Sequence, residues 1–532
     1  MRPTNMENAF LKTRLLLAAM VAVASLTATA HAAAPGITGP TFNLTAQTAF
    51  LNQPDGNAVY AWGYGCNGAP SGFAPAAIPN ASCSTMQVPG PTLIVTEGQT
   101  VTVTLTNGLP AAAGNTSILF PGLTVTATGG VPGLMTQEAA PGGTVTYTFI
   151  ASSPGTRSYY SGTQGDLQVE MGLYGAVIVL PNSVPSTCTS GIHASNLTAE
   201  SFWHESDFRL SQSAYDHPQT CYDREYLFQF AEMDPKIHNA ALAQINDPVR
   251  AAACATGAAT PGCSLEVPTE PYHPAYFLIN GRSMPDDMDA NYGAEYPHQP
   301  YNGNPHMHPG ELTLIRVIGQ GRWQHPFHEH ANHVRILARD GNLLLSATDP
   351  NKLAGRLEFT TDTTPGQAFD GIFYFTGRGL NWDMYAHNPN SSDPSAVLPC
   401  TPDANGYNTG APNAINYFEW CQDHNKPLEV APFGDVASGG PTTLPDADIF
   451  TNGAWYSGSP YLGPDATVRS MGTNTGNFLP ANTQANPANE RGWAFMWHSH
   501  NEREITTNNV FPGGMMMMML VDSREFVIDE SN

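Results

Sequence analysis

Histidines gather in two short stretches of this chain, with the spacing of metal ligands. The first stretch contains four histidines within nine residues: His325, His328, His330 and His333. The second, near the C-terminus, contains His498 and His500 and is followed by Glu504. Neutral imidazole is a common metal ligand. Alternate residues of a β-strand face the same side, so each H-x-H pair can direct two imidazoles into one pocket. The two stretches therefore predict a metal site that uses His328, His330, His498 and His500.

Strands must position these histidines, and most of the chain has the pattern of strands. Thr100–Asn107 and Gly143–Phe149 alternate apolar residues with threonine, a period of two that buries one face of a strand. Further strands are expected at Gly175–Leu180, Glu311–Ile318 and Val334–Ala338. Short strands separated by Gly/Pro turns are typical of a β-sandwich. The prediction is an all-β protein.

Composition limits the partners of the protein. The chain has 532 residues, a formal net charge of −24 and only 12% charged residues. A net negative charge argues against nucleic acid and against anionic lipid as partners, because both need basic surfaces. An apolar run at Leu15–Leu26, followed by the small residues Ala30 and Ala32, predicts a signal peptide over residues 1–32. We expect no membrane span and a secreted or periplasmic protein.

All eight cysteines lie in the expected mature chain. In an oxidising compartment an even number indicates disulfides rather than metal thiolates, and none lies in a C-x-x-C motif. Eight cysteines allow 105 pairings, of which we expect the pairing of sequence neighbours: Cys66–Cys83, Cys188–Cys221, Cys254–Cys263 and Cys400–Cys421.

The pattern suggests two β domains. Residues 40–181 form the first, and residues 182–270 form a linker or insert with one short helix between Pro235 and Ala253, together with the start of the second domain. Residues 271–522 complete the second domain. It carries the histidine motifs and a long insertion of Asn/Pro/Gly-rich loops at 388–490.

Four stretches of the chain resemble the multicopper oxidase family. Gly90–Asn107 and Met171–Val179 are similar to its first cupredoxin domain. His325-Pro-Phe-His-Glu-His is similar to its H-P-x-H-x-H motif, and Trp497–His500 to its final H-C-H block. The resemblance implies two cupredoxin-like sandwiches, copper as the cofactor, and copper ions and a small-molecule or metal-ion electron donor as partners. Relatives with two domains often trimerise, but the oligomeric state is left open here.

The resemblance breaks at many of the family's copper ligands. Where the family has four histidines in its first domain, this chain has Leu119, Pro121, Tyr160 and Gly162. Ser499 stands at the position of the cysteine that makes a type 1 copper blue, and Glu504 at that of a second type 1 histidine. His325 matches the remaining type 1 histidine, and could form with Glu504 a separate site for copper, iron or manganese.

Three functions agree with this reduced ligand set. The chain could be a copper oxidoreductase with a non-blue, histidine-ligated site, a copper-binding or copper-tolerance protein without catalysis, or a cupredoxin scaffold without metal. The residues assigned to metal are His325, His328, His330, His498, His500 and Glu504; whether any catalysis survives is open.

Two further motifs have simpler structural interpretations. Met515–Met519 is expected to be a buried core strand, although thioethers also suit Cu(I). His306 and His308 are expected to lie in an exposed loop, with a second soft ligand pair as the alternative.

Overall fold

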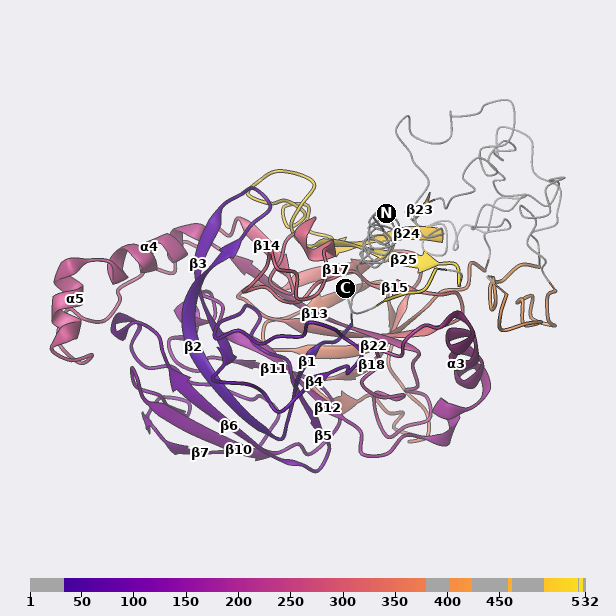
Figure 1. Cartoon of the computed structure of the whole chain (residues 1–532), viewed down its shortest axis with the longest axis horizontal. Helices are drawn as coiled ribbons and strands as arrows, with labels where there is room; N and C mark the ends of the chain where they lie inside the picture. Colours follow the sequence, from indigo (N-terminus) through magenta and orange to yellow (C-terminus); the bar gives the residue numbers. More distant parts are fainter. Residues whose placement is uncertain are drawn as a thin grey trace, which may run out of the picture.

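The computed structural model describes residues 33–378, 401–422 except 415, 458–461 and 492–529 except 525. The predicted signal peptide, Cys400 and most of the 388–490 insertion lie outside the described residues. The architecture is all-β, with four main sheets that form two cupredoxin-like sandwiches, as predicted (Figure 1).

The N-terminal sandwich contains two five-stranded sheets. One has the order β11-β12-β5-β1-β4, with bounds Gly155–Tyr160, Tyr174–Leu180, Leu93–Thr96, Gly36–Thr38 and Phe73–Ala74. The other has the order β3-β2-β6-β10-β7, with bounds Ala58–Cys66, Thr41–Asn52, Thr100–Asn107, Thr144–Ile150 and Val125–Gly129. The expected alternation is present, because Val103 pairs with Tyr147 and both are fully buried, whereas Thr104 pairs with Thr146 on the outer face. A short hairpin, β8 (Val131–Pro132) and β9 (Gln137–Glu138), extends this half.

The C-terminal sandwich carries the histidine motifs. Its larger sheet runs β14-β13-β16-β22-β18-β19, with β20 beside β18; the bounds are Tyr276–Ile279, Arg224–Met233, Leu312–Gly319, Ala368–Tyr374, Val334–Arg339, Asn342–Leu343 and Leu357–Glu358. Its second sheet runs β15-β25-β24-β17-β21, with β23 beside β24; the bounds are His306–Met307, Met516–Asp522, Gly492–Ser499, His325–Glu329, Thr360–Thr363 and Gly458–Tyr461. Both expected histidine stretches thus belong to one sheet.

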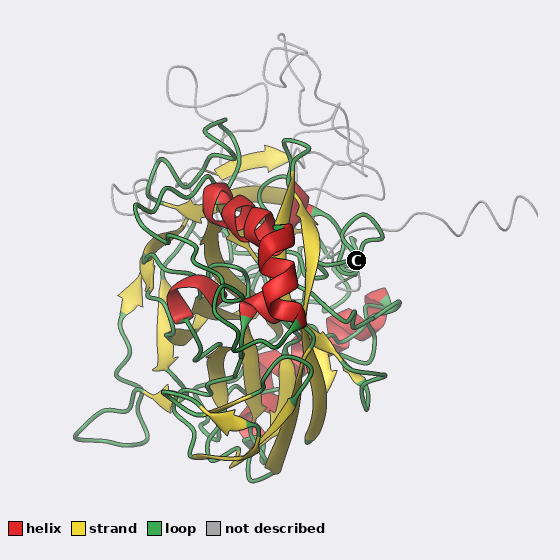
Figure 2. Cartoon of the chain, turned by 90° about the vertical axis from the view of Figure 1, so that its left-hand side faces the viewer, coloured by secondary structure: helices red, strands yellow, loops and turns green. Residues whose placement is uncertain are grey.

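Helices are few and peripheral (Figure 2). They are α2 (Gly165–Gln168), α3 (Gly191–Trp203), α4 (Pro235–Ile245) and α5 (Pro248–Ala255), with 3-10 turns η1 (Ala111–Ala113), η2 (Ser186–Thr189) and η3 (Asp286–Met288). The prediction of one helix at 235–253 was wrong. Pro248 starts a new helix. The Asp247 side chain caps its N-terminus by accepting a hydrogen bond from the Val249 amide at 2.9 Å. Among the described helices, none has the length and apolarity to cross a membrane.

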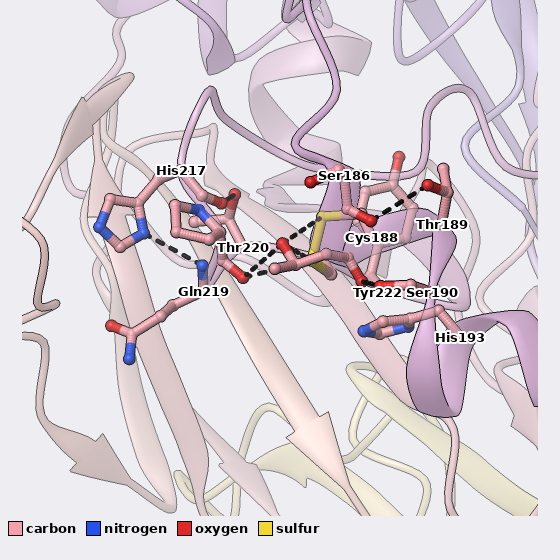
Figure 3. The surroundings of a disulfide bond; sticks show 12 residues. Ser186, Cys188, Thr189, Ser190, His193, His217, Gln219, Thr220 and Tyr222 are labelled. Atoms are coloured by element: carbon pink, nitrogen blue, oxygen red, sulfur yellow. Dashed lines mark hydrogen bonds between the residues drawn. A yellow bond between two sulfur atoms is a disulfide. The ribbon is translucent and has the colours of Figure 1, made fainter.

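Three of the expected disulfides are present. They join Cys66 to Cys83, Cys188 to Cys221, and Cys254 to Cys263. The second fastens η2 to the segment that leads into β13, where Gln219 and Thr220 lie beside it (Figure 3). Cys421 is also disulfide-bonded, but its expected partner Cys400 lies outside the described residues.

The methionine run is a core strand, as predicted. Met515, Met517 and Met519 are fully buried in the apolar centre of the C-terminal sandwich, and Met518 on the opposite face of β25 is half-buried. Unbranched thioethers fill irregular core space well, so packing accounts for the three methionines of the inner face.

The two sandwiches are packed against each other through buried contacts. An apolar cluster joins Ile94, Ala176 and Ile178 of the first to Leu227, Ile318 and Ala368 of the second. Polar contacts accompany it, because the Asp370 carboxylate accepts from the Thr156 and Tyr215 hydroxyls. Since carboxylates are rarely buried without such partners, these bonds fix how the two sheets meet.

Candidate metal centre

Strand pairing brings the two H-x-H pairs together. β17 lies antiparallel to β24, and their register places His328 opposite His498 and Phe327 opposite Ser499. In such a pair, opposite residues point to the same face of the sheet. Two motifs separated by about 170 residues therefore become neighbours, which is the juxtaposition that the sequence predicts.

The four imidazole rings lie in one cluster. The ring centroid of His328 lies 4.8 Å from that of His330, 4.8 Å from that of His500 and 5.6 Å from that of His498. The Nε2 atoms of His330 and His498 are 3.2 Å apart. Two imidazole nitrogens that share one ion, each bonded at about 2.0–2.1 Å, lie roughly 3 Å apart. The spacing therefore suits two ligands of a single metal ion.

Hydrogen bonds orient two of these rings with Nδ1 turned outward. His498 Nδ1 lies 2.7 Å from the Ser499 carbonyl oxygen, which can only accept, so Nδ1 carries the proton and Nε2 keeps its lone pair. His328 Nδ1 lies 2.7 Å from the Thr360 hydroxyl. Such contacts around metal-binding histidines fix the tautomer and the direction of the other nitrogen.

Burial favours the neutral form of two of these imidazoles. His328, His330 and His498 are at most 5% exposed. Burial, together with the neighbouring His498 and His500, lowers the pKa of His328 to about 4. Burial also lowers the pKa of His498. Imidazole must be neutral to bind a metal. The side chain of His500 is 49% exposed, so the cluster reaches solvent on that side.

His325, the expected type 1 ligand, is instead held between two carboxylates. Its Nδ1 lies 2.9 Å from Glu504 Oε2 and its Nε2 lies 3.0 Å from Glu232 Oε2. Burial opposes the charged ring, but the hydrogen bonds to Glu232 and Glu504 raise the pKa of His325 to about 9. Carboxylates only accept, so the ring donates from both nitrogens and is an imidazolium at neutral pH. In this form it offers no lone pair to a metal.

Glu504 is fixed on its other side as well. It accepts hydrogen bonds from the Ser499 hydroxyl and from the Asn501 side-chain amide. Ser499 and Glu504 stand where the resemblance places cysteine and histidine. They bond to each other, and Glu504 also bonds to His325. An ion-paired hydrogen-bond cluster therefore occupies the position that the resemblance assigns to the type 1 copper.

In the first domain, other side chains pack into the positions where the resemblance places histidines. Leu119 and Tyr160 pair through their backbones, and a Cβ atom built on Gly162 would lie 2.7 Å from Leu119 Cγ. No side chain larger than hydrogen fits at Gly162 unless Leu119 moves. The leucine therefore fills the place of an imidazole with apolar packing.

Comparison with known proteins supports the resemblance to the family. Residues 80–184 match the family model "Multicopper oxidase". The chain carries a multicopper oxidase domain. A segment of 107 residues is 37% identical to "Multicopper oxidase MCE" of Talaromyces pinophilus, but it spans only 19% of this chain and 17% of that protein. The resemblance to the family is thus confirmed.

Solved structures with a similar arrangement include a multicopper oxidase, mgLAC, and the blue copper oxidase of Nitrosomonas europaea. The first is 14% identical in sequence with a TM-score of 0.44, and the match covers 90% of this chain and 86% of the mgLAC chain. The second has 15% identity and a TM-score of 0.44, with 90% and 85% covered.

The side chains of the histidine cluster are suitable ligands for copper. Imidazole nitrogens bind copper well, whereas thiolate is what gives a copper its blue, electron-transferring character. The residues that would hold the ion are His328, His330, His498 and His500, and none of the four supplies sulfur. The centre fits a non-blue copper.

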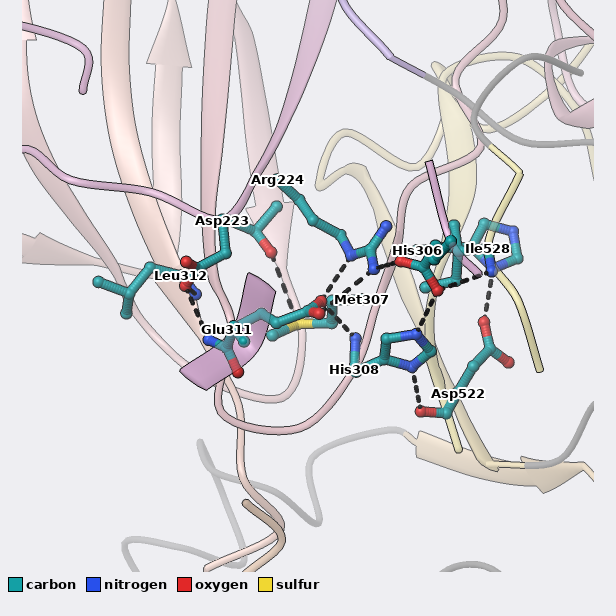
Figure 4. Close-up of polar contacts among 12 residues, drawn as sticks. Asp223, Arg224, His306, Met307, His308, Glu311, Leu312, Asp522 and Ile528 are labelled. Atoms are coloured by element: carbon teal, nitrogen blue, oxygen red, sulfur yellow. Dashed lines mark hydrogen bonds and ion pairs between the residues drawn. The ribbon is translucent and has the colours of Figure 1, made fainter. Parts of the chain in front are cut away.

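A second group of potential ligands is already neutralised. Carboxylate and imidazole atoms of Glu205, His308 and Glu311 lie within 4.8 Å of one another. The Arg224 guanidinium forms ion pairs with both carboxylates. Its Nε lies 2.5 Å from Glu311 Oε2 (Figure 4). A buried cation is therefore present where a metal would bind, and we interpret this group as an ion-pair network.

The prediction that His306 and His308 lie in an exposed loop was wrong. Both are 1% exposed, and both bond to Asp522 of β25, one to its carboxylate at 2.6 Å and one to its carbonyl oxygen at 3.0 Å (Figure 4). Parallel pairing of β15 with β25 buries this segment. Its histidines fasten the C-terminal strand instead of facing solvent.

Two residues that contact the predicted metal ligands were not identified from the sequence. Glu232 had a detectable signal, because it is the one carboxylate in residues 226–233 of β13, a mostly apolar run in which every residue is buried. A charge in such a strand requires a partner. Thr360 gave no signal, since a threonine in an edge strand is ordinary and only the pairing of β17 with β21 places it beside His328.

Restoring one ligand is not expected to restore a blue copper. Ser499→Cys alone should bind copper without intense blue absorption, because His325 and Glu504 still hold each other. Ser499→Cys combined with Glu504→His removes one carboxylate and supplies two ligands, and should turn blue on copper addition. Visible spectra of both, with Glu504→His alone as the control, test this; a blue single variant would contradict the ion-paired arrangement.

Proposed function

We propose that this protein is an exported copper oxidoreductase with one non-blue copper held by His328, His330, His498 and His500. The single observation that carries the proposal is the clustering of these imidazoles, in which Nε2 of His330 and Nε2 of His498 lie 3.2 Å apart. Bound copper would supply redox chemistry at this centre. The half-exposed ring of His500 is where this centre reaches solvent.

The chain's own residues would orient and protect this centre. Thr360 and the Ser499 carbonyl hold Nδ1 of two ligands, so that their Nε2 atoms face the ion. Phe359 packs edge-on against His328 at 5.7 Å between ring centroids and limits access of water from its side. A small reductant, organic or a metal ion, would approach from the side of His500.

A second candidate is a copper-binding protein that stores or delivers the ion without turnover. The replacement of the type 1 copper by the His325 ion pair favours it, because the family's electron entry point is then absent from this position. Both candidates use the same four histidines, and they differ only in whether oxygen is consumed.

Copper is expected to bind at about one ion per chain, since four ligands suit one ion, and to raise the melting temperature. A ligand that binds only the folded state stabilises it by about 2.7 kcal/mol at one hundred times its dissociation constant. Elemental analysis after dialysis and thermal melting with and without Cu(II) measure this. Oxygen uptake with a phenol or with Cu(I) under air then separates the enzyme from the binder. A metal-free scaffold would keep no copper and melt unchanged.

A further inference from the structure

The outer face of the larger C-terminal sheet holds a cavity that the copper centre does not use. Its volume is 620 Å³, within the roughly 300–1,000 Å³ typical of small-molecule sites. Leu312, Leu337 and Ile372, from the neighbouring strands β16, β18 and β22, form its floor with Tyr374. These side chains point away from the apolar centre of the sandwich, which the alternate residues of the same strands fill.

Loops complete the wall of this cavity. Leu353 and Leu357 come from the segment between β19 and β21, and Leu357 is 54% exposed. Gln219 lies near the Cys188–Cys221 disulfide (Figure 3). It holds that segment, because its Oε1 accepts a hydrogen bond from the Leu353 amide at 3.1 Å. The wall is thus apolar and is tied at one end to a cross-linked loop.

The charges that line the cavity are positive. Arg335 and Lys352 line it together with His333, and no carboxylate is among the lining residues. Arg335 is exposed and donates from Nη1 to the Gly355 carbonyl at 3.1 Å, while Lys352 lies 3.5 Å from Asp349. In a chain with a net charge of −24, an apolar cavity with a cationic rim is complementary to an organic anion.

We propose that this cavity binds an aromatic carboxylate, with the aromatic body on Leu312, Leu337 and Ile372 and the carboxylate on Arg335. Arg335 directly faces Ile372 across the β18–β22 pair, so the cationic group stands at the edge of the apolar floor. Guanidinium can bind a carboxylate with two parallel hydrogen bonds. The site does not depend on copper, although its His333 end packs on Phe359 at 5.1 Å, the ring that also contacts His328.

Calorimetric titration of the metal-free protein with 2-naphthoate, and with its neutral isostere 2-naphthamide, tests the proposal. We expect sub-millimolar affinity for the carboxylate and about ten-fold weaker binding of the amide, because a charge-assisted hydrogen bond is lost. Arg335→Gln should weaken 2-naphthoate about ten-fold and leave 2-naphthamide unchanged. Leu357→Ala should weaken both probes, since both use the apolar wall.

Arg356→Gln is the matched control, because Arg356 is an exposed arginine near the cavity that does not line it. Equal affinity for the two probes, an equal loss with both arginine variants, or no saturable binding of 2-naphthoate up to its solubility limit would overturn the proposal. Because the protein carries no metal in this experiment, its outcome is independent of whether the copper function holds.

Discussion

Replacing His498 or His500 by alanine is expected to lower the affinity for Cu(II) by about a thousand-fold. Loss of a group that only orients a metal ligand costs roughly ten- to a hundred-fold, and loss of a ligand itself costs more. His498 is the ring whose Nε2 lies 3.2 Å from that of His330, and His500 is the ring nearest solvent. Competition with a chelator of known affinity measures the change, and electron paramagnetic resonance reports the altered ligand field.

His333→Ala is the control for these variants. It removes a histidine from the same motif, but the His333 ring packs on Phe359 instead of joining the four converging rings. His500→Ala tests whether misfolding explains a loss of copper affinity. Its side chain is half-exposed, so shortening it should change the free energy of unfolding only a little. If the metal-free variants melt like the original protein and still bind copper equally well, the four-histidine centre is wrong.

The sequence was sufficient for the pairing of the two histidine motifs. Each H-x-H alternates along a strand, and a strand that buries one face fixes which residues share a side. The register of β17 and β24, which places His328 directly opposite His498, then puts both pairs on the same side of the sheet. The Val/Thr alternation of β6 was equally readable, because it results from local periodicity.

The sequence was insufficient where long-range packing decides. His306 and His308 are followed by Pro309-Gly310, a sequence typical of a turn. Parallel pairing with β25, about 210 residues later in the chain, nevertheless buries both histidines. The role of His325 was also hidden, since Glu232 lies 93 residues before it and only the fold brings the two together. A motif indicates which side chains could bind a metal, but their competing partners come from other strands.

The carboxylates at the former type 1 position explain why a charged histidine persists in the core. A buried imidazolium is costly unless it is paired and hydrogen-bonded. Here Glu232 and Glu504 pair with both ring nitrogens, and Glu232 also accepts from the Arg322 and Trp323 amides at 2.7 and 2.8 Å. Glu232 bonds to residues just before β17, and Glu504 bonds to the loop after β24. The group of His325, Glu232 and Glu504, which we call the clasp, therefore joins three segments of the chain.

Breaking this clasp should have a large effect on stability. His325→Phe leaves two buried carboxylates without their cation, and removing one partner of such a group typically costs about 3–5 kcal/mol. We expect a correspondingly lower denaturant midpoint for metal-free protein at pH 7. Adding Glu504→Gln to His325→Phe should recover part of the loss, because one uncompensated charge is then removed. A loss that is unchanged in the double variant would indicate a cavity effect instead of electrostatics.

The clasp should also make stability depend on pH. The pKa of His325 is raised to about 9 in the folded protein from about 6.5 in the unfolded chain. A raised pKa contributes stability that is fully present below about pH 6.5 and is lost as the pH rises through 9, on the order of 3 kcal/mol in total. Denaturant midpoints of the metal-free protein from pH 6 to 9.5 should therefore fall more steeply for the original chain than for His325→Phe, with His333→Ala following the original. Parallel curves for all three would mean that His325 is neutral in the fold, and its second ring nitrogen would then be free to bind a metal after all.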